Sequence, residues 1–217
     1  MSTPKPHTTV ATRMSGIRPD WLAKTTEEIT MAVEGGVGLI VVDGPDDVDR
    51  LEAIVPAGRV QDVLVRIIPG VTADTHAHVL TGHEGSKFGL LPEAAAALIR
   101  RIDHSPRLRM RGVHAHVGSQ ILQPEPLAAA VAPLAALGQF DIYDLGGGLG
   151  ARYTWTDQPP AIAEYLDVLI AAAREHLPPK AEIIIEPGRS MVASSAMTIY
   201  RVITIKRGPI TFVAVDG

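Results

Sequence analysis

An alternation of apolar strand-like runs with helical segments constrains the fold of this 217-residue chain more than any other feature. In the first unit, "VGLIVVDG" is followed by Val48, Leu51 and Ile54 at helical spacing, behind acidic first-turn residues. Strands that are apolar throughout are buried on both faces, so their alternation with helices predicts a parallel sheet covered by helices. The further strand-like runs are "DVLVRIIPG", "LRMRGVHAHVGS", "DIYDLGGG" and "AEIIIEPGR", and the helical segments between them are "PEAAAALIRRI", "EPLAAAVAPLAAL" and "PAIAEYLDVLIAAAREHL".

Composition shifts along the chain predict three parts. Residues 1–22 are rich in Thr, Pro and Ser and lack periodicity, which predicts a poorly ordered leader that carries no chemistry. Residues 23–192 contain the strand and helix alternation. Residues 193–217 change to β-branched, alternating sequence, which is typical of antiparallel strands and indicates the start of a second, all-β domain.

Charge and composition exclude several classes of function. The net charge is -4 and basic residues form no block, so we expect no binding to nucleic acid or to an anionic membrane. The longest apolar stretch is short and interrupted by Pro133, which predicts no membrane span. The absence of cysteine excludes disulfides, thiolate metal sites and thiol catalysis, and it fits a cytoplasmic protein. A small-molecule partner is therefore expected.

Polar residues and glycines follow every predicted strand. Ligands of parallel α/β folds gather at the carboxyl ends of the strands, because the loops there open toward a common mouth. We therefore expect the site among the residues at these ends, which are Asp43, Arg66, His116, Ser119, the glycines 146–148 and residues 186–189.

The glycine-rich stretch "DLGGGLG" allows two interpretations. Its spacing satisfies the Gly-x-Gly-x-x-Ala pattern of dinucleotide sites, but "ARYTWTDQPP" separates it from the next helix, which disfavours that interpretation. Consecutive glycines also expose main-chain N–H groups that can surround a phosphate. Together with Glu186, Gly188 and Arg189 of "EPGR", where Gly188 would free the backbone, the glycines indicate an anion-binding cradle.

Two histidines share one face of a predicted strand, because residues two apart point the same way. His114 fits a hydrogen-bonded core residue as well as it fits a ligand. His114, His116 and Asp144, together with His76 and His78, could instead surround zinc in a metal-dependent hydrolase. This remains an alternative from the residues alone.

Glu186 favours a different ligand. A carboxylate at the end of an apolar strand needs a cationic partner, and a protonated pyridine nitrogen would be one. An imidazole stacked on that ring would explain His116.

Several motifs of the chain, in their order and spacing, show a family resemblance. The chain resembles the diaminopimelate decarboxylases and their ornithine and arginine decarboxylase relatives, which are fold-type III pyridoxal phosphate enzymes. Gln120 is similar to the diaminopimelate branch. The resemblance runs from about Thr25 to Gly217, through "VRIIPGV", "THAHVLTGHEGSKFGL", "GVHAHVGSQI", "DLGGGLG", "IIEPGRSMVA" and "FVAVDG".

The resemblance implies an α/β fold, namely a partial (β/α)8 barrel of the alanine-racemase-like type with the start of a C-terminal β domain. A complete barrel needs ~250 residues. Five strand signals rather than eight predict an open sheet with exposed edges. The resemblance also implies a small amino-acid substrate and, because relatives are usually dimers, a homodimer or a complementing chain as partner.

The resemblance assigns the site residues one by one, with no metal. His116 would stack on the cofactor ring and Glu186 would pair with its nitrogen. Arg189, beside Gly188, would contact phosphate or the substrate carboxylate. Arg66 would approach the ring hydroxyl and Asp43 would support the site. The phosphate would be bound by Ser119, Gly146, Gly147 and Gly148.

Two departures from the family pattern shape the expected activity. The family's Schiff-base lysine lies on a strand before the point where this chain begins to match, and none of the lysines here has its context; Lys24 resembles a later, non-catalytic lysine. Relatives also continue past "VDG". We therefore expect a diaminopimelate decarboxylase-like protein of lysine biosynthesis that is impaired alone and holds its cofactor non-covalently. A non-catalytic pyridoxal phosphate-binding protein or a split-enzyme subunit remains open.

Overall fold

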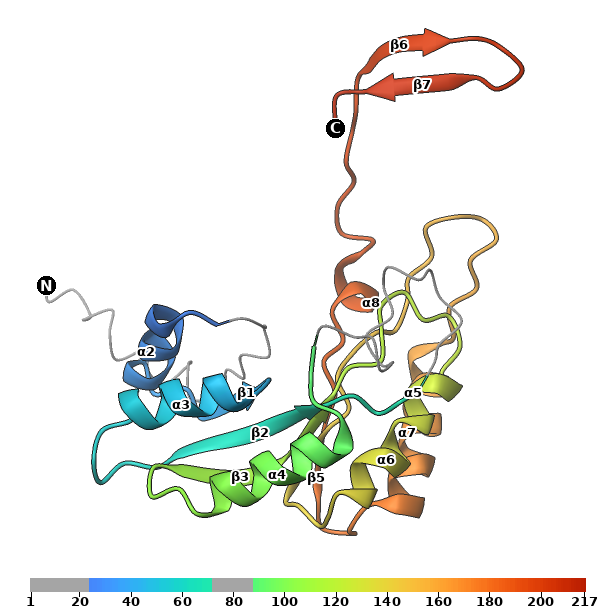
Figure 1. The fold of residues 1–217 in the computed structure, drawn as a ribbon. Coiled ribbons are helices and arrows are strands. Elements are labelled where there is room, and N and C mark those ends of the chain that lie inside the picture. Colours follow the sequence, from blue (N-terminus) through green and yellow to red (C-terminus); the bar gives the residue numbers. More distant parts are fainter. Residues whose placement is uncertain (1–23, 72–87) are drawn as a thin grey trace, which may run out of the picture.

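The computed structural model describes residues 24–71 and 88–217, and its main feature is a parallel five-stranded sheet (Figure 1). The strands follow the chain order from β1 to β5 across the sheet. Among the described residues, β1 and β5 each pair on one side only, so the sheet is open and the predicted α/β partial-barrel class is confirmed. The predicted leader lies outside the described residues. The strands are β1 (Leu39–Val42), β2 (Gln61–Ile67), β3 (Leu108–Ala115), β4 (Ile142–Asp144) and β5 (Glu182–Ile184).

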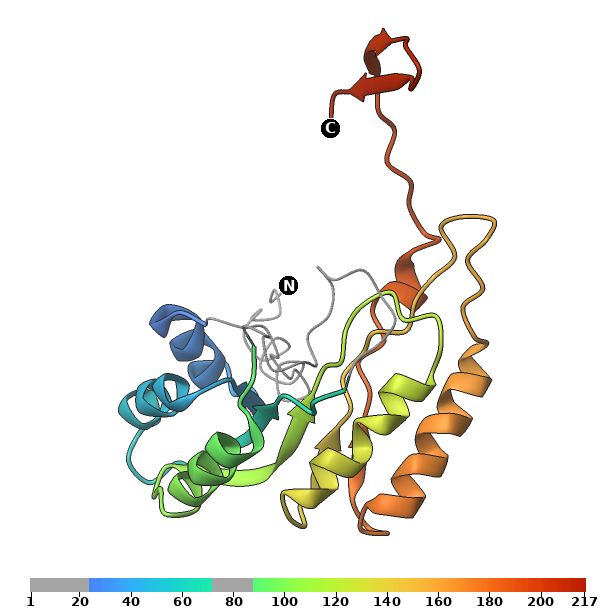
Figure 2. The ribbon, with the colours of Figure 1, turned by 45° about the vertical axis from the view of Figure 1, so that its right-hand side comes forward.

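Helices form an outer layer over one face of this sheet (Figure 2). Pro45 and Pro92 are the first residues of two of them, a position where the missing N–H of proline leaves no hydrogen bond unmade. The helices are α2 (Thr26–Glu34), α3 (Pro45–Ile54), α4 (Pro92–Asp103), α5 (Glu125–Ala129), α6 (Val131–Ala136), α7 (Ile162–His176) and α8 (Arg189–Val192).

The helical segment after β3 differs from its prediction. The sequence predicts one helix there, but the structure ends α5 at Ala129 and begins α6 at Val131. Pro133 explains the break, because it has no N–H to donate to the carbonyl of Ala129 and its ring crowds that carbonyl.

Helix α2 was not predicted, although its start carries a local signal. The backbone N–H of Thr25 donates to Glu28 Oε2 at 2.7 Å, and the N–H of Glu28 donates to Thr25 Oγ1 at 3.2 Å. This reciprocal capping box satisfies two N–H groups at the helix start. Beside it, the buried Lys24 Nζ lies 3.2 Å from Asp47 Oδ2 of α3, which ties the start of α2 to the outer layer.

The two faces of the sheet have different cores. The larger core lies between the sheet and the helices, where Val65, Val113 and Tyr143 pack with Leu98 and Leu134. A smaller apolar cluster lies on the inner face and comprises Leu39, Val41, Leu64, Ile142 and Ile184. Burial on both faces explains the continuous apolar residues of β1 and of the middle of β2.

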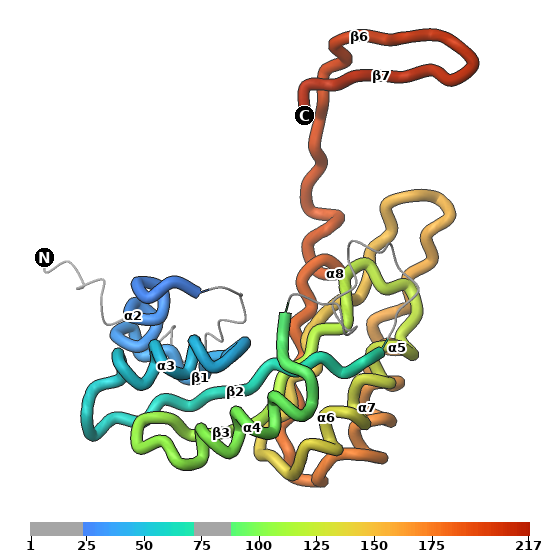
Figure 3. Tube along the Cα trace, in the orientation of Figure 1, coloured from blue at the N-terminus to red at the C-terminus, as the bar shows by residue number. Residues whose placement is uncertain are grey.

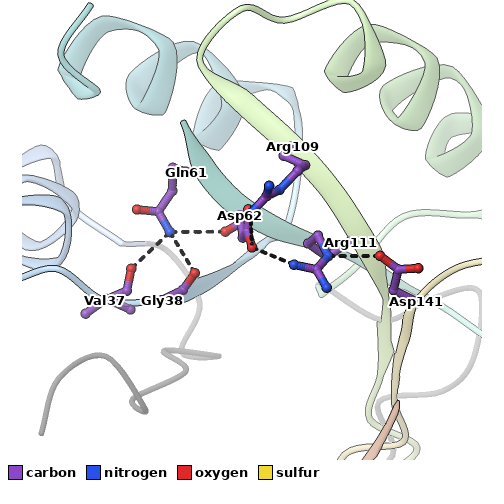
Figure 4. A network of polar contacts seen from close by, with 7 residues as sticks. All are labelled: Val37, Gly38, Gln61, Asp62, Arg109, Arg111 and Asp141. Carbon is purple, nitrogen blue, oxygen red and sulfur yellow. Dashed lines mark hydrogen bonds and ion pairs between the residues drawn. The ribbon is translucent and has the colours of Figure 1, made fainter. Parts of the chain in front are cut away.

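A polar network joins the amino ends of neighbouring strands (Figure 4). The buried Gln61 amide donates to two backbone carbonyls just before β1, at 3.0 and 3.3 Å. Asp62 accepts from Arg109 at 2.6 Å and from Arg111 at 2.9 Å, and Arg111 also pairs with Asp141 at 3.2 Å. Partly exposed ion pairs of this kind typically contribute only ~0–1 kcal/mol each, so the network mainly fixes register.

The last part of the chain forms an antiparallel pair, β6 (Val202–Lys206) with β7 (Phe212–Val215), as the alternating sequence predicts. Figure 3 shows an extended segment between α8 and this hairpin. The boundary of a second domain near residue 193 stays a prediction. Within residues 24–71 and 88–217, no helix combines the length and apolarity needed to cross a membrane.

Candidate functional site

The inner face of the sheet changes from apolar to charged toward the carboxyl ends of the strands. Arg66 of β2 lies opposite His114 of β3, and His114 lies opposite Asp144 of β4. Directly opposed residues of neighbouring parallel strands point to the same face, so these three side chains lie side by side. His114 and Asp144 are fully buried and Arg66 is 5% exposed. Such a row of buried ionisable groups is costly unless its members are paired.

Asp43 and Arg66 form the first pair in this row. Asp43 follows β1, and its Oδ1 accepts the backbone N–H of Gly89 at 2.7 Å and lies 4.0 Å from Arg66 Nε. Burial raises the pKa of Asp43, while the Gly89 N–H and the Arg66 charge oppose that rise. The Arg66 guanidinium also lies 5.4 Å from the centre of the Phe88 ring. The guanidinium is therefore held from two sides, in keeping with the supporting role expected for Asp43.

His114 lies near two carboxyl groups at the other end of the row. Its Nε2 is 3.5 Å from Glu186 Oε2, just beyond β5. Burial raises the pKa of Asp144 to about 6; His114 opposes the rise, and the neighbouring Glu186 carboxylate adds to it. Two carboxyl groups in an enclosed setting favour a cation beside them. The carboxyl end of β5 therefore suits a cationic ligand group.

The glycine turn after β4 brings three strand ends together. A Cβ on Gly147 would lie 2.2 Å from the carbonyl oxygen of Glu186, and one on Gly146, where φ is +67°, would lie 2.3 Å from that of Ala115. The N–H of Glu186 donates to the Gly146 carbonyl at 2.8 Å. The N–H of Gly147 donates to His116 Nδ1 at 3.3 Å, which fixes the ring orientation. These glycines allow backbone contacts that any side chain would block.

Gly188 differs from the glycines of that turn. Its φ is -107°, and a Cβ there would meet no atom within 4 Å. Neither backbone conformation nor crowding requires glycine at this position, contrary to the reason expected from the sequence.

Arg189, the first residue of α8, forms the rim of the site with residues from two loops. Its guanidinium donates to the Tyr153 hydroxyl at 2.7 Å and to Ser119 Oγ at 3.2 Å. It also lies 5.6 Å from the centre of the Tyr153 ring. Ser119 and Arg189 are thus adjacent although 70 residues separate them. Tyr153 was not predicted from the sequence, because it lies in a loop without periodicity or a motif.

Gln120 fixes the two loops that carry the rim. Its backbone has φ +58°, an uncommon conformation for a residue with a side chain. Its side-chain amide donates to the Ala151 carbonyl at 2.6 Å and accepts the Ala151 N–H at 3.1 Å. A short parallel bridge between Ile121 and Leu149 adds to this connection. The loop after β3 is therefore held against the loop after β4.

The structure thus places all ten predicted site residues at or beyond the carboxyl ends of the strands, in an inner row and a rim. The residues of the alternative zinc site do not all lie together among the described residues. His114, His116 and Glu186 have ligand atoms within 4.8 Å of one another, whereas Asp144 does not belong to that group among the described residues. His76 and His78 lie outside the described residues.

The donor groups fit pyridoxal phosphate. Glu186 would offer its partly buried carboxylate to a protonated ring nitrogen. His116 would offer a flat ring, which the glycine turn holds in place. Arg189 and Ser119 would offer donors to a phosphate at the rim. The set therefore suits a ligand with a cationic aromatic ring at one end and a phosphate at the other.

This fold and these groups define a segment of an α/β barrel that binds a phosphorylated cofactor. The family described as "Pyridoxal-dependent decarboxylase, pyridoxal binding domain" matches residues 20–193. The chain belongs to this family, and pyridoxal phosphate is its cofactor. The family resemblance seen in the motifs is confirmed, and the assignment favours the pyridoxal interpretation over a metal-dependent hydrolase.

Similar proteins include diaminopimelate decarboxylases. Those of Mycobacterium tuberculosis and Bacillus subtilis are each 37% identical over 89% of this chain, which covers 49% and 48% of them. The crystal structure of the Helicobacter pylori enzyme complexed with L-lysine has a TM-score of 0.78 and 28% identity, over 90% of this chain and 51% of that one. The chain spans about half the length of the curated relatives it matches.

Proposed function

We propose that this chain carries the pyridoxal phosphate-binding half of a diaminopimelate decarboxylase, which converts meso-diaminopimelate to lysine and carbon dioxide. The family assignment and the identity to diaminopimelate decarboxylases support this proposal. The observation that carries it is the position of Glu186, whose carboxylate lies beside the buried His114 while its backbone contacts the glycine turn.

In this proposal the inner row serves the cofactor ring. Glu186 holds a proton on the ring nitrogen, and Arg66, steadied by Asp43, approaches the ring hydroxyl. His116 stacks on the ring in the orientation that the Gly147 N–H imposes. When bound, the cofactor supplies a ring that withdraws electrons from the bond that breaks as carbon dioxide leaves. The chain keeps that ring protonated and oriented.

The rim serves anionic groups. Ser119, the glycine turn and the backbone beside Gly188 bind the phosphate, and Arg189 contacts the phosphate or the substrate carboxylate. A guanidinium held by Tyr153 and Ser119 is already oriented toward such an anion, which lowers the cost of ordering it on binding.

The substrate class, the partner and the location are proposed from the family resemblance and the composition. The substrate is a small amino acid, and a homodimer or a complementing chain would complete the site, as in the relatives that the motifs resemble. A cytoplasmic location is proposed because the sequence contains no cysteine.

A pyridoxal phosphate-binding subunit without activity of its own is the second candidate, and the position of Lys24 favours it. Lys24 is 3% exposed, and its Nζ is held 3.2 Å from Asp47 Oδ2 in a buried ion pair. Borohydride reduction of the loaded chain, followed by mass spectrometry, should leave Lys24 unmodified. A stoichiometric adduct there would remove this candidate.

A titration tests the principal proposal. Wild type and Glu186→Gln are titrated with pyridoxal phosphate, and thermal melts confirm that both are folded. Removing one partner of a buried charge pair typically costs ~2–5 kcal/mol, so the variant should bind well over tenfold more weakly. Equal affinities in two equally folded proteins would remove Glu186 from the site.

A further inference from the structure

His114 occupies a position that the proposed cofactor contacts do not explain. It lies within β3, two residues before His116 on the same face, and its side chain is fully buried. An apolar residue at this depth would pack without the cost of burying an imidazole. The reason for histidine should therefore lie in what its nitrogen atoms contact.

Two carboxyl groups flank this imidazole from different strands. On one side, the strand register sets Asp144 directly opposite His114. On the other side, Glu186 Oε2 lies 3.5 Å from His114 Nε2. Glu186 follows β5, which pairs only with β4 among the described strands. The buried imidazole of His114, in the middle of the sheet, is one of the groups that can restrain the Glu186 side chain.

We propose that His114 is a positioning residue that, held opposite Asp144, directs the Glu186 carboxylate toward the ring nitrogen of the cofactor. The inference rests on the proposed function, because it assumes that Glu186 faces that nitrogen. In this arrangement His114 acts through Glu186 and needs no contact of its own with the cofactor. Its effect is transmitted through the geometry and charge of Glu186.

A pair of ligands isolates this effect from general damage to the fold. Pyridoxal phosphate and its 1-deaza analogue have the same phosphate, hydroxyl and aldehyde, but the analogue has carbon in place of the ring nitrogen. The change in the ratio of their dissociation constants between wild type and a variant therefore reports mainly on the nitrogen contact. A loosened fold would weaken both ligands equally and leave the ratio unchanged.

Three substitutions of His114 test which atom matters. His114→Leu removes both nitrogens, His114→Asn places its amide near the Nδ1 position, and His114→Gln places it near Nε2. Leu and Asn should each lower the preference for pyridoxal phosphate about tenfold, the scale of a lost polar contact to a charged group. Gln should keep the preference within about threefold of wild type. Asp62→Asn, at the amino end of the sheet, is the control and should match wild type.

The outcomes separate the inference from the proposed function. If wild type itself does not prefer pyridoxal phosphate over the deaza analogue, the nitrogen contact of Glu186 fails, and the inference fails with it. If wild type shows the preference but folded His114→Leu or His114→Asn keeps it, the positioning role is wrong while the proposed function stands. In a Glu186→Gln background, His114→Asn should change the ratio no further; an additional loss would show that His114 acts by another route.

Discussion

Substitution of Asp144 by asparagine should stabilise the protein in a strongly pH-dependent way. Asp144 is fully buried on β4, and its pKa is raised to about 6 from the ordinary value of 3.8, mainly because burial disfavours the charged form. The folded protein therefore binds this proton more tightly than the unfolded chain does. Asparagine has no proton to lose, and its side-chain oxygen can still accept the Gly146 N–H, which lies 3.0 Å from Asp144 Oδ1.

The size and sign of the effect follow from that difference in pKa. Well below pH 3.8 the carboxyl group is protonated in both states, and ionisation costs wild type nothing. As pH rises through the interval between 3.8 and about 6, ionisation increasingly favours the unfolded chain, and the penalty is complete above that interval. At ~1.4 kcal/mol for each pKa unit, the full penalty is about 3 kcal/mol.

Urea unfolding of wild type and Asp144→Asn, followed by circular dichroism between pH 4 and pH 8, measures this difference. The free energy of unfolding of the variant should rise relative to wild type by about 2.5 kcal/mol across that range, at most ~1.4 kcal/mol per pH unit. Two parallel curves would refute the raised pKa of Asp144. If the variant instead lost stability relative to wild type as pH rises, the pKa of Asp144 in the folded protein would have to be lowered.

Two further substitutions test the glycine turn and the rim. Gly147→Ala should lower stability by about 1–3 kcal/mol and weaken pyridoxal phosphate binding, because its Cβ would overlap the Glu186 carbonyl. The control Gly208→Ala, whose Cβ would make only an ordinary 3.7 Å contact with the Ile210 carbonyl, should change neither by much. Equal melting temperatures of wild type and Gly147→Ala would contradict the crowding. Tyr153→Phe should keep the melting temperature of wild type but bind inorganic phosphate several-fold more weakly, because phenylalanine has no hydroxyl to orient Arg189. Competition of inorganic phosphate with pyridoxal phosphate for binding measures this effect. An unchanged inhibition constant of phosphate would contradict the role of Tyr153.

The sequence was sufficient to predict the sheet because burial on both faces leaves a strong local pattern. The parallel strands are built around apolar runs, of which β1 is the most continuous, and polar residues after them, such as Asp43 and Glu186, mark where the runs end. The start of α2 and the break between α5 and α6 depended on single residues and not on an apolar pattern. The capping box at Thr25 was present but not used to assign α2, and the break between α5 and α6 follows from Pro133.

Contacts within the site were less predictable, because they depend on strand register and loop path. That His114 and His116 share a face follows from their spacing, but that His114 lies opposite Asp144 and near Glu186 requires three aligned strands. Tyr153 reaches Arg189 through a loop whose sequence has no periodicity. No local pattern encodes such a meeting of distant segments.

The protonation state of the bound ring nitrogen tests the central claim most directly. Pyridoxal phosphate labelled with ¹⁵N in the ring is bound to wild type and to Glu186→Gln, and the nitrogen chemical shift is measured by NMR. The carboxylate of Glu186, beside His114 and Asp144, should give wild type the shift of a protonated pyridinium and the variant that of a neutral pyridine. A neutral nitrogen in loaded wild type, or a protonated one in both proteins, would contradict the site proposed for this chain.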